Sequence, residues 1–284
     1  MIEERLEYDV VIVGGGPAGL AAAIRLKQHD SSTSVCVIEK GAEIGSHILS
    51  GAVLEPEALT ELLPHWKDDG APVNVKVTHD TFTFLTESSS FNVPHWVLPR
   101  ELTHDNHFII SLGTLCRWLG EQAEGLGIDI FSSTTAAEIL LENNIVIGIK
   151  TGDLGINNQG QAKNHHVPGT PIHANYTLIA EGARGFLAEK IIQHFQLRAP
   201  EQHQTYGLGI KELWEIDPSQ HQQGLVQHTA GWPLDHRTYG GAFFYHLNNN
   251  KLAFGFVTAL DYQNPSFNPF AECQRVKLHP TIKP

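Results

Sequence analysis

The sequence is poor in cysteine, in positive charge and in long apolar runs. Its three cysteines, Cys36, Cys116 and Cys273, lie far apart and form no CxxC pair. This spacing excludes a disulfide framework, offers no sequence-evident metal site and is typical of a reducing compartment. A formal net charge of −12 argues against a nucleic-acid partner, because binding to phosphates requires a basic face.

No apolar run is long enough to predict a transmembrane helix. The best candidate, residues 10–24, is interrupted by Gly14-Gly15-Gly16-Pro17 and falls short of the roughly 18 to 20 apolar residues that span a bilayer. The charged residues 1–5 lead directly into an apolar run, so we expect no signal or transit peptide. The sequence therefore predicts a cytosolic or peripheral membrane protein.

Residues 8–40 carry the most informative motif. The apolar run 10–13 predicts a parallel strand buried on both faces, and residues 20–26 are rich in helix formers. Between them lies a GxGxxG pattern at Gly14, Gly16 and Gly19, and a second short strand at 35–38 ends on Glu39. This order predicts a dinucleotide-binding unit, whereas the alternative is a glycine-rich structural turn.

Each of these residues has a physical role in such a unit. Gly14 allows the tight turn, Gly16 lets a pyrophosphate approach the backbone, and Gly19 lets the helix pack closely on the strand. Glu39 follows about 20 residues later, where a carboxylate can accept hydrogen bonds from ribose hydroxyls and would repel a 2′-phosphate. The motif favours FAD or NAD over NADP and does not choose between the first two.

A second turn of similar character follows the apolar run 176–180, where Glu181 and Gly182 lead into a predicted helix. Such a second turn, after an intervening hairpin at 137–149, is typical of FAD proteins with two motifs. The alternative is a plain strand-to-helix connection. The segment 45–66 is less specific, because its amphipathic helix pattern suits docking onto the core or contact with lipid.

The last third of the chain predicts four antiparallel strands between residues 204 and 260. Gly240 and Gly241 stand beside aromatic residues, where bare backbone could meet a planar ring, although a glycine pair is also a common strand entry. The 17 histidines lie mostly in polar loops, as His104 and His107 do, and predict surface positions and no metal site.

Six segments carry a resemblance to a known family: residues 11–26, 47–56, 119–127, 206–214, 231–247 and 260–265. In them the sequence resembles the electron transfer flavoprotein-ubiquinone oxidoreductases, a membrane-bound family that passes electrons from electron transfer flavoprotein to ubiquinone. The resemblance implies contacts with FAD at Val13, Gly14, Gly16, Pro17, Ala18, Gly19, Glu39, Lys40, Ser50, Gly51, Glu181 and Gly182. It implies ubiquinone binding at Gly240 and Gly241, and peripheral membrane contact through residues 45–66.

The resemblance also implies the fold class, which is α/β. We expect a Rossmann-like FAD-binding domain with a mostly parallel sheet over 1–75 and 100–198, and an antiparallel ubiquinone-binding sheet over 76–99 and 199–270. Residues 271–284 would begin a return to the first domain. The chain resembles only the N-terminal half of the family. The family also has a 4Fe-4S cluster, and none of the three cysteines of this chain matches a ligand of that cluster.

The function that the resemblance implies is electron transfer without a catalytic acid, base or nucleophile in this chain. One alternative is an FAD-dependent reductase or monooxygenase of the geranylgeranyl-reductase type, and another is a non-catalytic fragment. The expected location is the cytoplasmic face of a bacterial inner membrane, or the matrix face of the inner membrane if the protein is mitochondrial.

Overall fold

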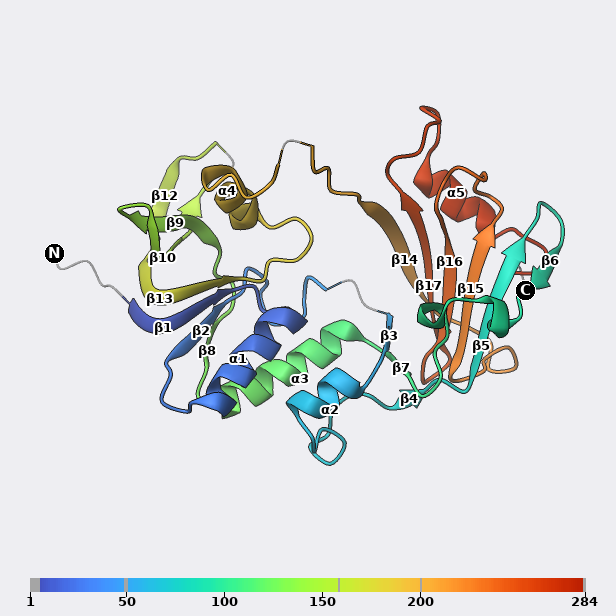
Figure 1. The fold of residues 1–284 in the computed structure, drawn as a ribbon, viewed down its shortest axis with the longest axis horizontal. Coiled ribbons are helices and arrows are strands. Elements are labelled where there is room, and N and C mark those ends of the chain that lie inside the picture. The colour runs from blue at the N-terminus through green and yellow to red at the C-terminus, as the bar shows by residue number, and fades with distance from the viewer. Residues whose placement is uncertain (1–5, 49–50, 158, 200, 283–284) are drawn as a thin grey trace. The chain divides into compact units, whose positions relative to one another are not determined.

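The computed structural model describes residues 6–48, 51–157, 159–199 and 201–282, and it divides into two compact units (Figure 1). The first unit comprises residues 1–48, 62–64 and 112–202, and the second unit comprises residues 49–61, 65–111 and 203–284. None of the described helices is long and apolar enough to cross a bilayer.

The first unit is built on a six-stranded sheet that confirms the predicted Rossmann-like class. Its strands lie in the order β8 (Asp129–Phe131), β2 (Val35–Ile38), β1 (Leu6–Val13), β13 (Pro171–Ile179), β10 (Ile145–Thr151) and β9 (Ala136–Glu142). The first four strands are parallel, whereas β10 and β9 join as antiparallel strands. The sheet is therefore mostly parallel around β1, as the apolar run of that strand predicts.

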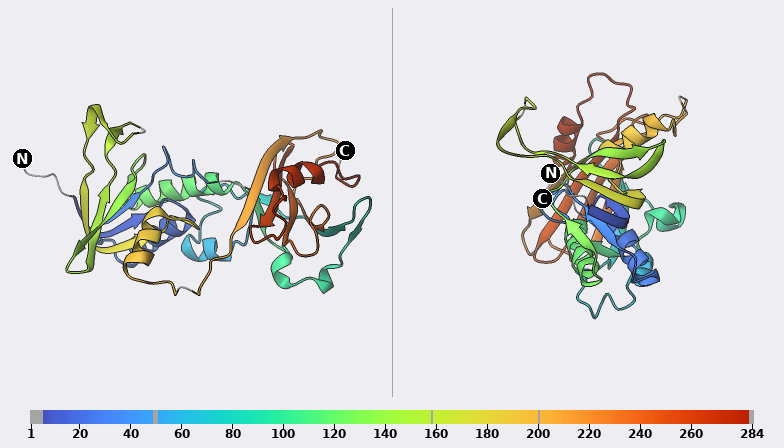
Figure 2. Two further views of the ribbon diagram at one scale, coloured as in Figure 1. Left: turned by 90° about the horizontal axis from the view of Figure 1, so that it is seen from above. Right: turned by 90° about the vertical axis from the view of Figure 1, so that its left-hand side faces the viewer.

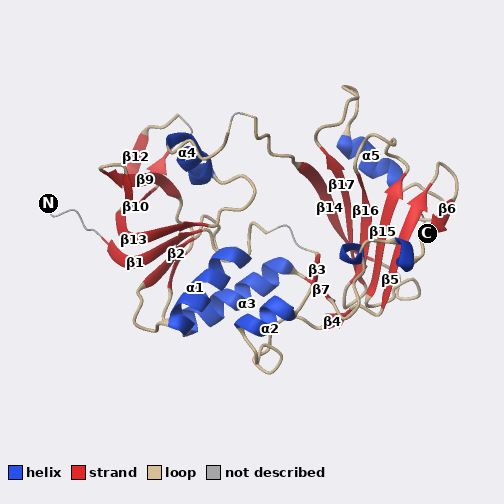
Figure 3. Cartoon of the chain, viewed as in Figure 1, coloured by secondary structure: helices blue, strands red, loops and turns tan. Residues whose placement is uncertain are grey.

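Helices complete the first unit. Helix α1 (Pro17–His29) and helix α3 (Leu112–Gly125) lie side by side (Figure 3), and α4 (Phe186–His194) follows β13. The β10 and β9 hairpin turns through Asn143 and Asn144, whose positive φ angles of 49° and 64° suit asparagine. A separate pair of short strands, β11 (Leu154–Ile156) and β12 (Ala162–Val167), lies outside the main sheet.

The second unit is built on a sheet that is antiparallel except at one pair. Its order is β14 (Gly207–Glu215), β17 (Lys251–Ala259), β16 (Gly240–His246), β15 (Leu225–Gly231), β5 (His79–Leu85) and β6 (Ser90–Asn92). Only β15 and β5 run parallel among these described strands. The four strands predicted between residues 204 and 260 are therefore present.

Each face of the second sheet is covered differently. Helix α5 (Pro269–Val276), dark red in Figure 2, packs on one face of the sheet. Its residues Cys273 and Val276 lie in a core with Phe254 and Phe256. The opposite core includes Tyr245 and Val226, and the small sheet β3 (Ala52–Leu54), β7 (Phe108–Ile110) and β4 (Val75–Lys76) supplies Val75 and Ile109 to it. Three short helices, α2 (Glu57–Leu62), η1 (His95–Val97) and η2 (Arg100–Leu102), complete the unit.

This packing draws the boundary between the units differently from the predicted domains. Residues 51–61, 65–75 and 100–111, which we assign from sequence to the first domain, belong to the second unit, where β7 pairs with both β3 and β4. Helix α5 also packs on the second sheet instead of returning to the first domain, because Cys273 and Val276 are buried against its strands.

Candidate functional site

The glycine-rich turn lies at the carboxyl end of β1, where each glycine meets a different environment. Gly14 has a φ of +111°, and a Cβ there would collide with the Ala180 carbonyl oxygen. A Cβ on Gly19 would collide with the Gly14 carbonyl oxygen, so this glycine lets α1 pack closely on the turn. A Cβ on Gly16 would have no described atom within 4 Å. The open space above Gly16 suits a phosphate group.

Helix α1 presents its first turn to this space. Gly16 is the N-cap residue, Pro17 occupies the first turn, and among the described residues no side chain caps this helix end. The first turn also contains no acidic residue. Because the amides at a helix N-terminus favour anions, the end of α1 is suited to a pyrophosphate.

Glu39 lies beside the turn, directly after β2. Its Oε2 atom accepts a hydrogen bond from the Gly15 amide at 2.9 Å, and Oε1 accepts one from the Gly41 amide at 2.6 Å. The carboxylate is thereby held at the edge of the proposed ligand space, with the exposed Lys40 next in sequence. The sequence places a carboxylate here but does not reveal its bonds to the two glycine amides.

The second predicted turn lies next to the first. Strand β13 pairs with β1 in parallel, and the Ala180 amide donates to the Val13 carbonyl oxygen at 2.8 Å. Gly182 has a φ of +82°, and a Cβ there would meet no described atom within 4 Å. Strands β2 and β13 flank β1 on opposite sides, so the two turns meet where a doubly wound sheet binds its ligand.

The Glu181 side chain bonds to the protein's own backbone and not toward the ligand space proposed above. Its Oε2 atom accepts a hydrogen bond from the Ala188 amide at 2.8 Å, in the first turn of α4. The carboxylate therefore stabilises the start of that helix, as acidic groups do at helix N-termini. Its contribution to a ligand site would come from its backbone.

The resemblance names two further residues, Ser50 and Gly51, as contacts with FAD. Ser50 is outside the described residues, and Gly51 belongs to the second unit with a φ of +105°. A Cβ on Gly51 would collide with Nζ of Lys211, a residue of β14 that sequence reasoning overlooked. Burial lowers the pKa of Lys211 to about 8, so this ammonium loses its proton more readily than an ordinary lysine.

Gly240 and Gly241 begin β16, between β17 and β15. A Cβ on Gly240 would collide with the Val257 carbonyl oxygen, and one on Gly241 would collide with the Thr229 carbonyl oxygen. Gly240 also has a φ of +153°. Close packing of three strands therefore requires both glycines, whatever else they bind.

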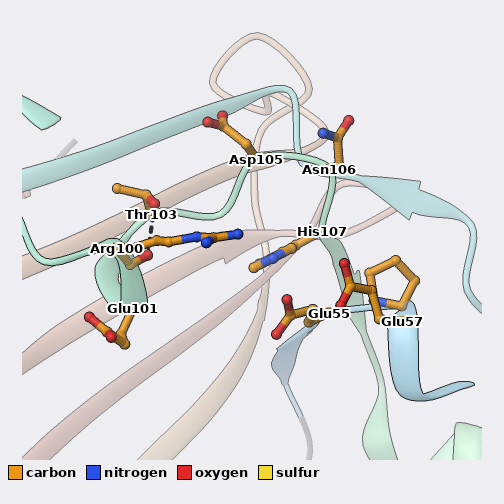
Figure 4. A pocket seen from close by; sticks show the side chains of 9 residues that line it. Glu55, Glu57, Arg100, Glu101, Thr103, Asp105, Asn106 and His107 are labelled. Atoms are coloured by element: carbon orange, nitrogen blue, oxygen red, sulfur yellow. Dashed lines mark hydrogen bonds between the residues drawn. The ribbon is translucent and has the colours of Figure 1, made fainter. Parts of the chain in front are cut away.

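A cavity of about 740 Å³ lies in the second unit, and sequence reasoning did not anticipate it (Figure 4). Four carboxylates line it, together with five other residues; the lining consists of Glu55, Pro56, Glu57, Arg100, Glu101, Thr103, Asp105, Asn106 and His107. Its acidic lining does not suit a quinone, because apolar ligands favour apolar walls.

The amphipathic segment within residues 45–66 turns much of its apolar face inward. Leu59 and Trp66 are only 6% and 3% exposed. The Trp66 ring packs edge-on against Phe108, and its indole nitrogen donates to the Thr60 hydroxyl at 3.0 Å. These contacts favour the core-docking alternative for the segment over contact with lipid.

An open phosphate space at a helix N-terminus, beside a carboxylate and at the edge of a parallel sheet, defines a dinucleotide-binding oxidoreductase of the Rossmann class. Residues 8–207 match the family model described as pyridine nucleotide-disulphide oxidoreductase, and the chain belongs to this family. Residues 206–284 match a second model, described as the ubiquinone-binding part of electron transfer flavoprotein-ubiquinone oxidoreductase.

Similar sequences confirm the resemblance stated from the six segments. The chain is 50% identical over 290 residues to an electron transfer flavoprotein-ubiquinone oxidoreductase of Pseudomonas aeruginosa, covering 100% of this chain and 53% of the relative. It is 52% identical over 287 residues to the mitochondrial enzyme of Sus scrofa, covering 98% of this chain and 46% of the relative. The chain thus spans about half the length of the curated relatives it matches.

Solved structures share the fold. A geranylgeranyl bacteriochlorophyll reductase-like protein from Thermoplasma acidophilum superposes with a TM-score of 0.70 at 18% identity, covering 99% of this chain and 64% of that one. Aklavinone-11 hydroxylase, solved with FAD and aklavinone, superposes with a TM-score of 0.62 at 15% identity, covering 99% and 52%. At these identities the likeness concerns the fold alone.

Proposed function

We propose that this protein acts in electron transfer from reduced electron transfer flavoprotein, through FAD, to ubiquinone. The observation that carries the proposal is the order of two matched segments in one chain. A dinucleotide-binding oxidoreductase segment at 8–207 is followed by a ubiquinone-binding segment at 206–284. Identity of about 50% to electron transfer flavoprotein-ubiquinone oxidoreductases extends over both segments.

The residues around the glycine-rich turn fit FAD. The space above Gly16 and the uncapped first turn of α1 would hold the pyrophosphate, and Glu39 would bind the ribose. Bound FAD would supply redox chemistry that accepts and releases electrons one or two at a time. The protein's own residues bind and orient the cofactor, so no catalytic acid, base or nucleophile is assigned.

Gly240 and Gly241 are the proposed contact for the ubiquinone head group. Their backbone offers polar groups that can bond a quinone carbonyl. The strand packing that excludes a Cβ at both positions also makes this stretch of backbone rigid. The proposal needs this bare backbone, and the fold independently enforces it.

The electron transfer flavoprotein-ubiquinone oxidoreductases also use a 4Fe-4S cluster, and we propose that the three cysteines of this chain are not its ligands. Cys36, Cys116 and Cys273 are all buried and free. Burial raises the thiol pKa of Cys36 to about 12 and that of Cys116 to about 11, so neither readily forms the thiolate that a cluster requires.

Peripheral membrane contact is also part of the proposal, but its position changes. Because Leu59 and Trp66 are buried, we place the contact at Phe91, Trp96 and Val97 instead of residues 45–66. Trp96 is 87% exposed and Val97 is 56% exposed, next to Phe91 at 57%. Exposed aromatic side chains of this kind are favoured at a lipid interface.

A titration with FAD followed by anaerobic mixing with NADH and NADPH tests the proposed function. We expect the purified chain to bind FAD stoichiometrically and the bound flavin to stay oxidised with either nicotinamide, because electrons would arrive from a protein partner. Rapid flavin reduction by NADPH would favour a reductase or monooxygenase. A folded chain that binds no FAD would favour a non-catalytic fragment.

A further inference from the structure

We propose that Asp80, His104 and His228, in the second unit, bind a divalent transition-metal ion of the zinc class. Each of the three side chains offers one ligand atom, and these atoms lie within 4.8 Å of one another. This is the only group of its kind among the residues that the structure describes. The site depends on neither FAD nor ubiquinone and belongs to no part of the proposed electron transfer.

The sheet register brings two of the ligands to one face. Strands β5 and β15 run parallel, with Asp80 opposite Val226, and His228 lies two residues beyond Val226. Because side chains alternate along a strand, Asp80 and His228 point to the same face. Val226 packs there in the core with Ile109 of β7, so the pair lies on a largely covered face of the sheet.

The third ligand is delivered by the loop after η2. The backbone amide of His104 donates to Oδ2 of Asp80 at 2.9 Å, and its ring atom Nδ1 lies 2.9 Å from the same oxygen. The two side chains are only 13% and 6% exposed. The prediction of a surface histidine at position 104 is therefore wrong, because two hydrogen bonds fix this loop to β5.

His228 supplies the observation that points to a ligand. Its Nε2 atom is 2.8 Å from the Tyr245 hydroxyl, but its Nδ1 atom is buried and has no hydrogen-bond partner among the described residues. The rings of His228 and His104 stack with centroids 5.0 Å apart. A buried polar atom without a partner is rare in folded proteins, and a bound ion would satisfy it.

The ligand types suit a transition metal. Two imidazoles and a carboxylate match the ligand preference of zinc, cobalt and nickel more closely than that of magnesium or calcium.

The three ligand atoms would move slightly closer together when a metal ion binds. Tetrahedral zinc, with bonds of about 2.0 to 2.1 Å, holds its ligand atoms about 3.4 Å apart, somewhat closer than the 4.8 Å limit observed. Three protein ligands would leave a fourth position for water. Binding would tie together β5, β15 and the loop that carries His104.

A second histidine pair in the same unit provides a matched control. His221 and His246 have ring centroids 5.5 Å apart. However, Nδ1 of His246 accepts from the Gln222 amide at 3.1 Å, and Nε2 of His221 lies 2.7 Å from the Leu247 carbonyl oxygen. Both rings have partners, and this pair belongs to no described group that could hold an ion.

Calorimetric titration of the chelator-treated 284-residue chain with zinc tests the proposal, together with the visible spectrum after cobalt addition. We expect one zinc ion per chain and a cobalt spectrum typical of tetrahedral nitrogen and oxygen ligands. Affinity should fall at least about 100-fold in Asp80→Asn and His228→Gln and stay unchanged in His246→Gln. The absence of stoichiometric binding by wild type, or equal binding by His228→Gln, would overturn the proposal.

A second measurement avoids any variant that fails to fold. X-ray absorption of the zinc-loaded wild-type protein should show two imidazole ligands at about 2.0 to 2.1 Å. A spectrum with one imidazole or none would overturn the assignment, even if zinc binds stoichiometrically.

Discussion

Glu39 and Gly15 are joined by a hydrogen bond of 2.9 Å, in which the carboxylate oxygen Oε2 accepts from the backbone amide. The end of β2 is thereby tied to the turn that follows β1. The carboxylate that would bind a ribose also helps to hold the phosphate-binding turn in shape. One side chain thus connects the two halves of the proposed adenylate site.

Replacing Glu39 with Gln should weaken FAD binding by about 10- to 150-fold. A hydrogen bond to a charged group contributes about 1.5 to 3 kcal/mol, and a neutral amide cannot replace it fully. FAD titration followed by protein fluorescence measures the change. Glu43→Gln is the matched control, because Glu43 is more than half exposed and pairs with Arg117 at the surface. Equal losses in both variants would contradict the role of Glu39.

Replacing Gly16 with Ala should abolish FAD binding while the fold is retained. A Cβ at this position meets no described atom within 4 Å, so the methyl group would occupy the space proposed for the pyrophosphate. The thermal unfolding midpoint of the FAD-free protein should therefore remain close to wild type. Undiminished FAD affinity in a folded Gly16→Ala protein would mean that the pyrophosphate lies elsewhere.

Replacing Gly19 with Ala should destabilise the FAD-free protein, in contrast to Gly16→Ala. Its Cβ would collide with the Gly14 carbonyl oxygen, so α1 would have to move away from the turn. Overpacking of this kind costs about 1 to 3 kcal/mol in the free energy of unfolding. Denaturant unfolding of the FAD-free protein measures it, and a stability equal to that of Gly16→Ala would refute the close-packing role.

His246 should make the second unit less stable at acidic pH. Burial and the neighbouring charge of His221 lower the pKa of His246 to about 4, below its ordinary value of 6.5. Between these pH values the unfolded chain binds a proton that the folded chain does not. The free energy of unfolding should therefore fall as the pH decreases through this window, by up to about 1.4 kcal/mol per pH unit.

The variant His246→Gln should lose this part of the pH dependence, whereas His65→Gln should keep it, because His65 is exposed. Urea unfolding of both variants at several pH values between 4 and 7 makes the comparison. Parallel profiles for His246→Gln and wild type would show that His246 is protonated equally in both states.

The double substitution Trp96→Ser and Val97→Ser should weaken sedimentation with liposomes. Both side chains are exposed, so their burial in lipid would be lost without a cost to the fold. The comparison variant carries Ser at Leu62 and Leu63, which the structure leaves only partly buried. If the comparison variant alone lost lipid binding, the membrane contact would be assigned to residues 45–66 and not to Trp96 and Val97.

The sequence predicts the strand, turn and helix around Gly14, Gly16 and Gly19 because the determinants of this unit are local. The structure shows the tight turn at Gly14, open space at Gly16 and close packing at Gly19, whereas binding of an adenylate there stays a prediction. The carboxylate of Glu39 also lies where the motif puts it.

What the sequence does not reveal depends on contacts between distant segments. Asp80 and His228 are brought to one face only by the parallel pairing of β5 with β15, whose paired residues lie 146 positions apart in the sequence. The sequence indicates only a loop histidine at position 104, whereas the structure shows two hydrogen bonds between His104 and Asp80. Helix α5 is a similar case. Its buried residues pack against side chains from several strands of the second sheet, and this contact forms only when those strands are assembled.

The most direct test of the central claim is a stopped-flow measurement on the FAD-loaded chain. The flavin is reduced anaerobically and mixed with increasing concentrations of a short-chain ubiquinone analogue. Our account predicts reoxidation with a rate that saturates as the quinone concentration rises, which indicates a bound complex. A rate that rises linearly and equals that of free reduced FAD would contradict it.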